Sequence, residues 1–381
     1  MTGRFDVIVA GVGGMGSAVA YHLARRGKRV LGLERFDIPH EMGSSHGITR
    51  VIRLVYSEHP SYVPLLRRAY ELWDELERRA GERLLHLTGC VDASPPGGAI
   101  FEGSRRAAQE HGLAHEVLSG VELRHRFPGF QLPPDTMALL QPRAGFLLAE
   151  RCLVAHVEAA QAEGAEIRAR EPVEGWEVMR DGVRVRTARD VYEASALVVT
   201  AGAWAGSLVD RLKGLVTAER QVLAWFQPLK PELFTPERCP VWQFDAQEGR
   251  YYGLPVFGVP GFKVGRYHHL EERVDPDRVD REPNQADETI LRTFVERYFP
   301  QAAGPTMAMK VCLFENSPDE HFIIGRDPAH PQVSFAAGFS GHGFKFCPVV
   351  GEIMADLVER GSTPHDVSLF DPARFQAARR R

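Results

Sequence analysis

The apolar residues at the start of the chain alternate between a strand period and a helix period. Residues 6–10 form a short β-branched run that is typical of a buried strand. Residues 15–26 carry apolar side chains at helical spacing, and Gly27 ends the predicted helix. Residues 30–33 form a second apolar run, which ends at Glu34. This order predicts a β-α-β unit.

The turn inside this unit has the pattern G-x-G-x-x-G, with glycines at Gly11, Gly13 and Gly16. Such glycines permit a tight turn, let a pyrophosphate approach the backbone, and let helix and strand pack closely. The N–H groups at the start of the helix suit phosphates, and Glu34 is placed to accept hydrogen bonds from a ribose. An acid at this position disfavours a 2′-phosphate. The unit therefore predicts FAD or NAD rather than NADP.

Residues 46–55 have helical spacing, with apolar residues on one face and His46, Arg50 and Arg53 on the other. We therefore expect a helix here. Its basic face suits either an anionic substrate or simply solvent. An amphipathic helix is predicted to follow at residues 63–80.

The rest of the chain alternates between two kinds of pattern. A helix at 152–163 and a buried strand at 196–204 suit the nucleotide unit, although such a strand fits any buried sheet equally well. Residues 216–316 are rich in strand patterns broken by Pro and Gly, which favours an antiparallel sheet. Further elements are expected as strands at 165–168, 183–187 and 333–338, a turn at 341–343, and helices at 287–298 and 344–360.

These patterns predict two domains that exchange the chain repeatedly. We expect residues 1–81, 147–215 and 321–381 to form the nucleotide-binding domain. Residues 82–146, where Gly and Pro are frequent, and 216–320 are then expected to form a partly β second domain. A chain of 381 residues is long enough for two cores.

Composition narrows the class of protein. The formal net charge is −4, so no overall positive field attracts nucleic acid or an anionic membrane. No apolar run is long enough for a membrane span, and the first strand leaves no room before it for a cleavable signal. The 5 cysteines are scattered without metal-ligand spacing, which favours a reducing cytoplasm, no disulfides and no metal site.

Five motifs together resemble one family. They are GVGGMG at residues 11–16, GSSHGITRVIRLVY at 43–56, KVGRYHH at 263–269, KVCLFENSPDEHFIIG at 310–325 and AAGFSGHGFKF at 336–346. The chain is similar to the monomeric sarcosine oxidase and N-methyltryptophan oxidase family, within the wider D-amino-acid-oxidase-like flavoproteins. The resemblance implies a mixed α/β (α+β) fold, with a Rossmann-like FAD-binding domain and an interleaved antiparallel-sheet substrate domain.

The resemblance also implies how FAD is held. Cys312 matches the cysteine that is joined through sulfur to the flavin 8α-methyl, and Lys310 is expected to add positive charge if it points inward. The helix that starts near Gly343 is expected to direct its positive end at the flavin. The implied cofactor-binding residues are Gly11, Gly13, Gly14, Gly16, Glu34, Arg35, Ser44, His46, Arg50, Cys312, Gly343, Phe344 and Lys345.

For the substrate, the resemblance implies a carboxylate held by Arg53 and Lys345, with Tyr56 in the same region. Lys263 matches a lysine associated with the reaction of reduced flavin with O₂, because a cation beside O₂ stabilises the charge that forms there. Arg50 matches an arginine against the flavin face. The implied catalytic residues are Lys263, Arg50, Tyr252 and His268, with Tyr267 and His269 as alternatives to His268.

One departure from the family bears on the substrate. Phe314 stands where the sarcosine-specific members have a tyrosine, so a hydroxyl is lost from the pocket wall. This departure favours a substrate with a larger or more apolar N-substituent over sarcosine itself.

The implied function is a monomeric, cytoplasmic FAD-dependent oxidase of a secondary amino acid, N-methyl or cyclic, that reduces O₂ to H₂O₂. Two alternatives remain at this point. One is a flavin amine dehydrogenase with another electron acceptor, and the other is a non-catalytic flavin-fold binding protein.

Overall fold

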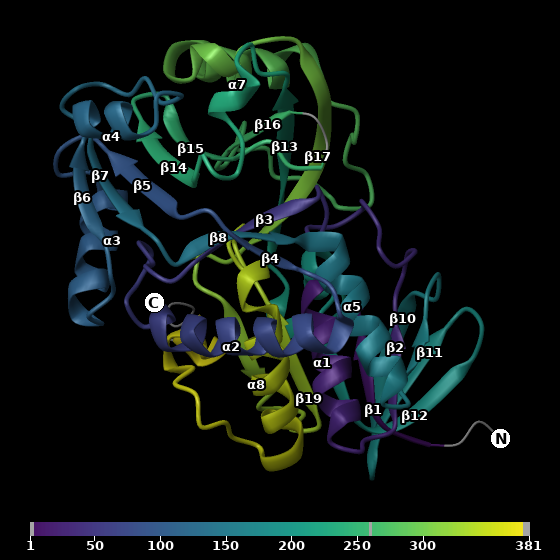
Figure 1. The fold of residues 1–381 in the computed structure, drawn as a ribbon. Helices are drawn as coiled ribbons and strands as arrows, with labels where there is room; N and C mark the ends of the chain where they lie inside the picture. Colours follow the sequence, from purple (N-terminus) through teal and green to yellow (C-terminus); the bar gives the residue numbers. More distant parts are fainter. Residues whose placement is uncertain (1–3, 259–260, 376–381) are drawn as a thin grey trace.

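Three β-sheets organise the described part of the chain, residues 4–258 and 261–375, in this computed structural model. An eight-stranded sheet with flanking helices fills the lower part of Figure 1, and a second eight-stranded sheet fills the upper part. A small sheet of three strands lies between them. The mixed α/β character predicted from the sequence is confirmed.

The first sheet is built on β1 (Phe5–Ala10), which runs parallel to β2 (Val30–Leu33) on one side and β12 (Val191–Val199) on the other. The predicted β-α-β unit and the predicted parallel strand are thus confirmed. The remaining strands of this sheet are β9 (Glu166–Arg168), β10 (Val173–Met179), β11 (Gly182–Thr187), β18 (Ile323–Arg326) and β19 (Val333–Ala337).

Helices α1 (Gly14–Arg25), α5 (Ala149–Ala162) and α8 (Cys347–Arg360) pack side by side, with α2 (Tyr62–Ala80) against α5 and α8. Their close approach depends on small residues. A Cβ added to Gly351 would lie 2.7 Å from the backbone carbon of Ala18. These helices and β1 share the largest apolar cluster of the described residues, which fixes α1 at the edge of the cavity described below.

The second sheet has the strand order β17-β13-β16-β15-β14-β5-β7-β6 and is antiparallel except for the parallel pair β14–β5. Helix α7 (Gln285–Tyr298) covers one face through an aromatic core around Trp242 and Phe294. The strands are β5 (Cys90–Ser94), β6 (Glu116–Ser119), β7 (Met137–Gln141), β13 (Thr217–Phe226), β14 (Val241–Ala246), β15 (Gly249–Leu254), β16 (Phe262–Arg266) and β17 (Thr306–Asn316). The expected antiparallel sheet is therefore confirmed in its main part. Helices α3 (Ala99–Glu110) and α4 (Gly120–Arg126) add to this half of the molecule.

The helix expected at residues 46–55 is wrong. This segment instead contains β3 (Thr49–Arg53), which pairs with β8 (Ala144–Leu148), and β8 pairs in turn with β4 (Leu85–Leu87). Gly47 and Ile48 both have positive φ, at 94° and 70°, which a right-handed helix cannot contain. Thr49, Val51 and Ile52 are β-branched, and residues of this kind pack well in strands.

The domain boundaries expected from the sequence remain a prediction. The three-stranded sheet joins β3, which precedes residue 82, with β4, which follows it, and with β8, which spans residue 147. In the described residues, no helix is long and apolar enough to cross a membrane, and no cluster of three metal-ligating side chains occurs.

Candidate active site

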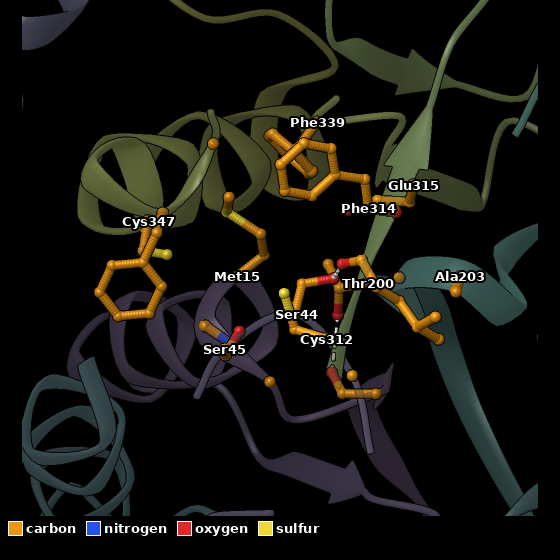
Figure 2. Close-up of a pocket in the computed structure, with 18 of the residues that line it drawn as sticks. Met15, Ser44, Ser45, Thr200, Ala203, Cys312, Phe314, Glu315, Phe339 and Cys347 are labelled. Atoms are coloured by element: carbon orange, nitrogen blue, oxygen red, sulfur yellow. Dashed lines mark hydrogen bonds between the residues drawn. The ribbon is translucent and has the colours of Figure 1, made fainter. Parts of the chain in front are cut away.

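A single continuous cavity runs from the carboxyl end of β1 to the inner face of the second sheet. Its lining extends from Glu34 and Arg35 at one end to Tyr252 and Tyr267 at the other. Figure 2 shows Met15, Cys312 and Cys347, from three different elements, around this cavity. The cavity brings together residues as distant in the sequence as Ala10 and Cys347.

The glycine turn forms one wall. Gly11 has φ of +91°, and a Cβ on Gly16 would lie 1.8 Å from the Gly11 oxygen, so both positions require glycine. Gly13 is the N-cap of α1 and supplies no side-chain cap. A Cβ at Gly13 would meet only the Ser45 Oγ, at 3.8 Å, so this backbone is open to a ligand. The start of α1 therefore has the form of a phosphate site.

Glu34 is held at the same end of the cavity. Its Oε2 accepts a hydrogen bond from the Val12 N–H at 2.8 Å, and its Oε1 accepts one from the Phe36 N–H at 3.0 Å. Arg35 forms an ion pair with Asp277 at 2.9 Å and lies over the Trp204 ring. Both Glu34 and Arg35 line the cavity, as a pair of groups around a nucleotide ribose would.

Cys312 lies in the middle of β17, buried and as a free thiol, with its side chain in the cavity lining. Burial raises the pKa of the thiol, and the positive charges of Arg50 and Lys263 oppose that shift. Lys310 points away and forms a surface ion pair with Glu41. The condition under which Lys310 was expected to contribute, that it points inward, is therefore not met, and Arg50 and Lys263 supply the positive charge near the thiol.

Arg50 is tied to the loop before β3, and its guanidinium donates to the Ser44 carbonyl at 2.8 Å and to the Thr49 carbonyl at 3.0 Å. The Ser44 hydroxyl donates to the Leu313 carbonyl at 2.6 Å, next to Cys312. Arg50 and Ser44 both line the cavity. The loop and β17 are thus fastened to each other on either side of the cysteine.

Lys263 is 2% exposed and is not among the residues that line the cavity, so it lies behind the cavity wall. Its Nζ donates to the carbonyls of Gly47 and Thr49, each at 2.7 Å. Burial first, and then Arg50, lower the pKa of this ammonium well below its usual value. His46, also fully buried and outside the lining, has a pKa lowered to about 3 by burial and by Arg50. The expected direct contact of His46 with the cofactor has no support in this geometry.

Arg53 and Lys345 both line the cavity and are almost completely buried. The Arg53 guanidinium donates to both carboxylate oxygens of Glu58 at 2.8 Å, while its Nη1 has no hydrogen-bond partner in the described chain. Lys345 Nζ donates to the His342 carbonyl at 2.8 Å and contacts the Tyr56 hydroxyl at 3.5 Å. Burial and the Arg53 charge lower the pKa of Lys345 to about 7.

Tyr56 supports this pair from behind rather than lining the cavity. Its hydroxyl lies 2.7 Å from the Nδ1 of His342, and its ring lies under the Arg53 guanidinium, 4.5 Å from the centroid. Tyr56 therefore contacts both cations from behind the cavity wall.

The place expected for His268 is wrong. Tyr267 lines the cavity beside Tyr252 and Phe314, with ring centroids 5.9 and 5.3 Å away. His268 has a φ of 52° and turns out of the lining, where it bridges Glu219 at 3.0 Å and Glu320 at 3.2 Å. These carboxylates raise the pKa of His268 to about 10. Because the backbone at residue 268 is left-handed, the His268 side chain lies outside the cavity, whereas the sequence spacing had placed it inside.

The wall near the last motif departs slightly from expectation. Gly343 and Phe344 line the cavity, but residues Phe344–Phe346 form a single 3-10 turn and α8 begins only at Cys347. The predicted helix from 344 is thus correct in position but not in its first turn.

Three polar residues of the site were not among those predicted from the sequence. Glu58 holds Arg53, Gln243 lines the cavity from β14, and Glu315 lines it next to Phe314. Burial raises the pKa of Glu315 to about 8. Of these three, only Gln243 could have been found from the sequence, because it is a polar residue inside an apolar strand pattern.

These residues fit FAD. The Glu34 carboxylate, the open glycine backbone and the buried thiol of Cys312 all line one cavity, and they suit the ribose, the pyrophosphate and the flavin of FAD respectively.

Comparison with known proteins agrees with this geometry. The model of the family described as FAD dependent oxidoreductase (DAO) matches residues 6–357. Monomeric sarcosine oxidase from Streptomyces avermitilis is 44% identical over 99% of this chain and 100% of that protein. N-methyl-L-tryptophan oxidase from Yersinia pestis is 33% identical over 98% of this chain and 100% of that protein.

Among solved structures, NikD, described as an unusual amino acid oxidase essential for nikkomycin biosynthesis, is similar in its open form. The TM-score is 0.85 at 27% identity, with 97% of this chain and 98% of that chain covered. L-proline dehydrogenase from P. horikoshii also reaches a TM-score of 0.85, at 22% identity over 99% of each chain, which is a likeness of fold.

Proposed function

The chain belongs to the FAD-dependent oxidoreductases of the DAO family, and from that premise we propose that it oxidises secondary α-amino acids, N-methyl or cyclic, with O₂ as the electron acceptor. The two relatives described above are named for sarcosine and N-methyl-L-tryptophan, which are both N-methyl amino acids.

One observation carries this proposal. Arg53 and Lys345, two buried cations that line the cavity, lie over the same Tyr56 ring, 4.5 and 5.2 Å from its centroid, and Arg53 Nη1 has no hydrogen-bond partner among the described residues. A planar guanidinium and an ammonium together suit a substrate carboxylate. Such a carboxylate would compete with Glu58 for Arg53.

When bound, FAD supplies the redox chemistry, taking a hydride equivalent from the amine and passing the electrons to O₂. The residues of the chain bind and orient the substrate. Arg53 and Lys345 hold the carboxylate, and the aromatic side chains of Tyr252, Tyr267 and Phe314 keep water from the amine. Lys263 adds positive charge near the site where O₂ is reduced.

A peroxide assay over a panel of amines tests the function. Sarcosine, N-methylalanine, N-methyltryptophan, proline and pipecolate are supplied to the holoenzyme in air, and we expect H₂O₂ from at least one. Arg53→Leu should raise KM for that substrate at least tenfold, because a charge-assisted contact is lost. Bleaching of the flavin without peroxide would indicate a dehydrogenase. The absence of both bleaching and peroxide would favour a binding protein.

We also propose that Cys312 carries FAD covalently through its sulfur. The supporting facts are the place of its buried thiol in the cavity and the two cations that favour its thiolate. After acid precipitation, the yellow colour should stay in the pellet, and in Cys312→Ala it should move to the supernatant. Cys239→Ala, a buried cysteine outside the cavity, is the control. Flavin that washes out of the unaltered protein would refute the linkage.

Two further parts of the proposal concern the state of the molecule. We propose a monomer in the cytoplasm, and light scattering of the purified holoenzyme checks the first of these.

A further inference from the structure

Three polar side chains stand in a row across the second sheet. Gln243 in β14 pairs in register with Asp92 in β5 on one side and with Tyr252 in β15 on the other. Gln243 and Tyr252 line the substrate end of the cavity, whereas Asp92 is completely enclosed beside them. Burial of a carboxylate is costly unless hydrogen-bond donors surround it, so the donors around Asp92 need to be identified.

Asp92 is satisfied by donors on both of its oxygens. Its Oδ1 accepts from the Gln243 Nε2 at 2.9 Å. Its Oδ2 accepts from the Ser104 hydroxyl at 2.7 Å and from the Gln141 Nε2 at 3.3 Å. A carboxylate of this kind can only accept hydrogen bonds, so it forces the amide of Gln243 to turn its NH₂ group inward.

The orientation of the Gln243 oxygen follows from this. The amide nitrogen contacts Asp92 and, at 3.4 Å, the Ser57 hydroxyl. The carboxamide oxygen therefore points away from Asp92, toward the cavity, and it accepts no hydrogen bond from the described residues. The wall thus presents a fixed acceptor that a ligand donor can reach.

This acceptor lies close to the proposed carboxylate site. Arg53 Nη1 is 4.0 Å from the same Asp92 Oδ1 that holds Gln243. The side chain of an amino acid branches one bond from its carboxyl carbon. A substrate carboxylate on Arg53 therefore brings the substrate's own side chain within reach of the Gln243 oxygen.

We propose that Gln243 selects secondary amino acids whose side chain carries a hydroxyl or N–H donor near Cβ, with Asp92 as the positioning residue. This rests on the proposed function. A bound substrate without the donor covers this oxygen and leaves it unpaired, which is how a polar wall discriminates between isosteres.

The test compares N-methylserine with its isostere N-methyl-2-aminobutyrate, in which a methyl replaces the hydroxyl. We expect the holoenzyme to favour N-methylserine at least tenfold in kcat/KM, and Gln243→Met to reduce that preference about tenfold. Asp92→Asn should reduce it as well, because an asparagine can donate to the Gln243 oxygen and let the amide reverse. Ser104→Ala, which removes another partner of Asp92 outside the cavity, is the control and should keep the preference.

Several outcomes overturn the inference. An unaltered protein without preference, or a Gln243→Met protein that keeps it, removes the selective role. An equal loss for both substrates shows that Gln243 contacts the shared amine instead. If the Gln243→Met protein loses its flavin, Gln243→Asn is used in its place, because the shorter side chain withdraws the oxygen by one methylene.

A measurement without turnover separates this inference from the proposed function. Binding of 3-hydroxypropanoate and butanoate to the holoenzyme, read from the flavin absorbance, should show the same preference for the hydroxyl. If no amine yields peroxide but this preference is present, the proposed function fails and the selective wall stands. If amines are oxidised but neither comparison shows a preference, the proposed function stands and the inference fails.

Discussion

Lys263 is a buried ammonium held by two backbone carbonyls behind the cavity wall. At an effective dielectric of about 20, a cation about 4 Å from a new negative charge stabilises it by ~4 kcal/mol. We expect Lys263→Met to slow reoxidation of reduced flavin by O₂ by up to about a thousandfold, measured by stopped-flow absorbance.

The matched control is Lys310→Met, a surface lysine on β17 that pairs with Glu41. It should leave reoxidation unchanged. An equal rate in both variants would remove Lys263 from the reaction with O₂. Because burial and Arg50 lower its pKa, the charge is lost as the pH rises through that lowered pKa, so the reoxidation rate should fall toward alkaline pH.

Lys345 offers a second pH dependence at the residue scale. Its pKa is lowered to about 7, so its charged form prevails below that pH. The affinity for a substrate carboxylate should therefore decline as the pH rises through about 7, and we expect KM to increase about tenfold. Steady-state assays from pH 6 to 9 check this, with Lys345→Met expected to show a high KM at every pH. A KM that stays constant in the unaltered protein would contradict it.

At the scale of elements, the turn between β1 and α1 depends on contacts that leave no space for a side chain. A methyl at Gly16 would lie 1.8 Å from the Gly11 oxygen and 2.6 Å from the Thr200 hydroxyl. Gly16→Ala should push α1 away from β1 and lower both FAD content and thermal stability, by several degrees or more. Flavin absorbance per protein and the melting temperature measure the two effects.

Gly175→Ala is the control, since its added methyl would meet only the Arg186 guanidinium, at 3.5 Å. It should bind FAD normally. A Gly16→Ala protein with full flavin and an unchanged melting temperature would show that the turn tolerates expansion.

At the scale of the whole molecule, the packing of α1, α5 and α8 encloses two histidines. His22 and His156 flank Tyr21, and burial lowers their pKa values to about 4 and about 3. Their neutral forms are stabilised by folding, so this stability is present above the unfolded pKa of about 6.5 and is lost as the pH falls.

We expect the free energy of unfolding to fall by ~3 kcal/mol through His156 alone between pH 7 and pH 4. His156→Phe, which keeps an aromatic ring beside Trp73, should make the decline shallower. Urea unfolding at several pH values measures it, with the exposed His125→Phe as control. Parallel pH profiles in all three proteins would show that His156 does not titrate on unfolding.

Local residue patterns were sufficient to predict the parts of the fold in which each residue depends on its neighbours along the chain. The β-α-β unit with Gly11, Gly13 and Gly16 was predictable because strand period, turn chemistry and helix period agree there. The antiparallel second sheet and the late strand β19 followed for the same reason.

The other features depend on contacts between segments that are distant in the sequence. Residues 46–55 have the spacing of a helix, yet Gly47 and Ile48 have positive φ and Thr49–Arg53 pair with β8 as a strand. The left-handed backbone at residue 268 turned His268 out of the cavity and left Tyr267 in its place. Asp92, Gln243 and Arg53 lie far apart in the sequence. Gln243 reaches Asp92 because β5 and β14 run side by side, and Arg53 approaches the same carboxylate from β3. Local propensity cannot report such contacts, since they depend on which strands become neighbours.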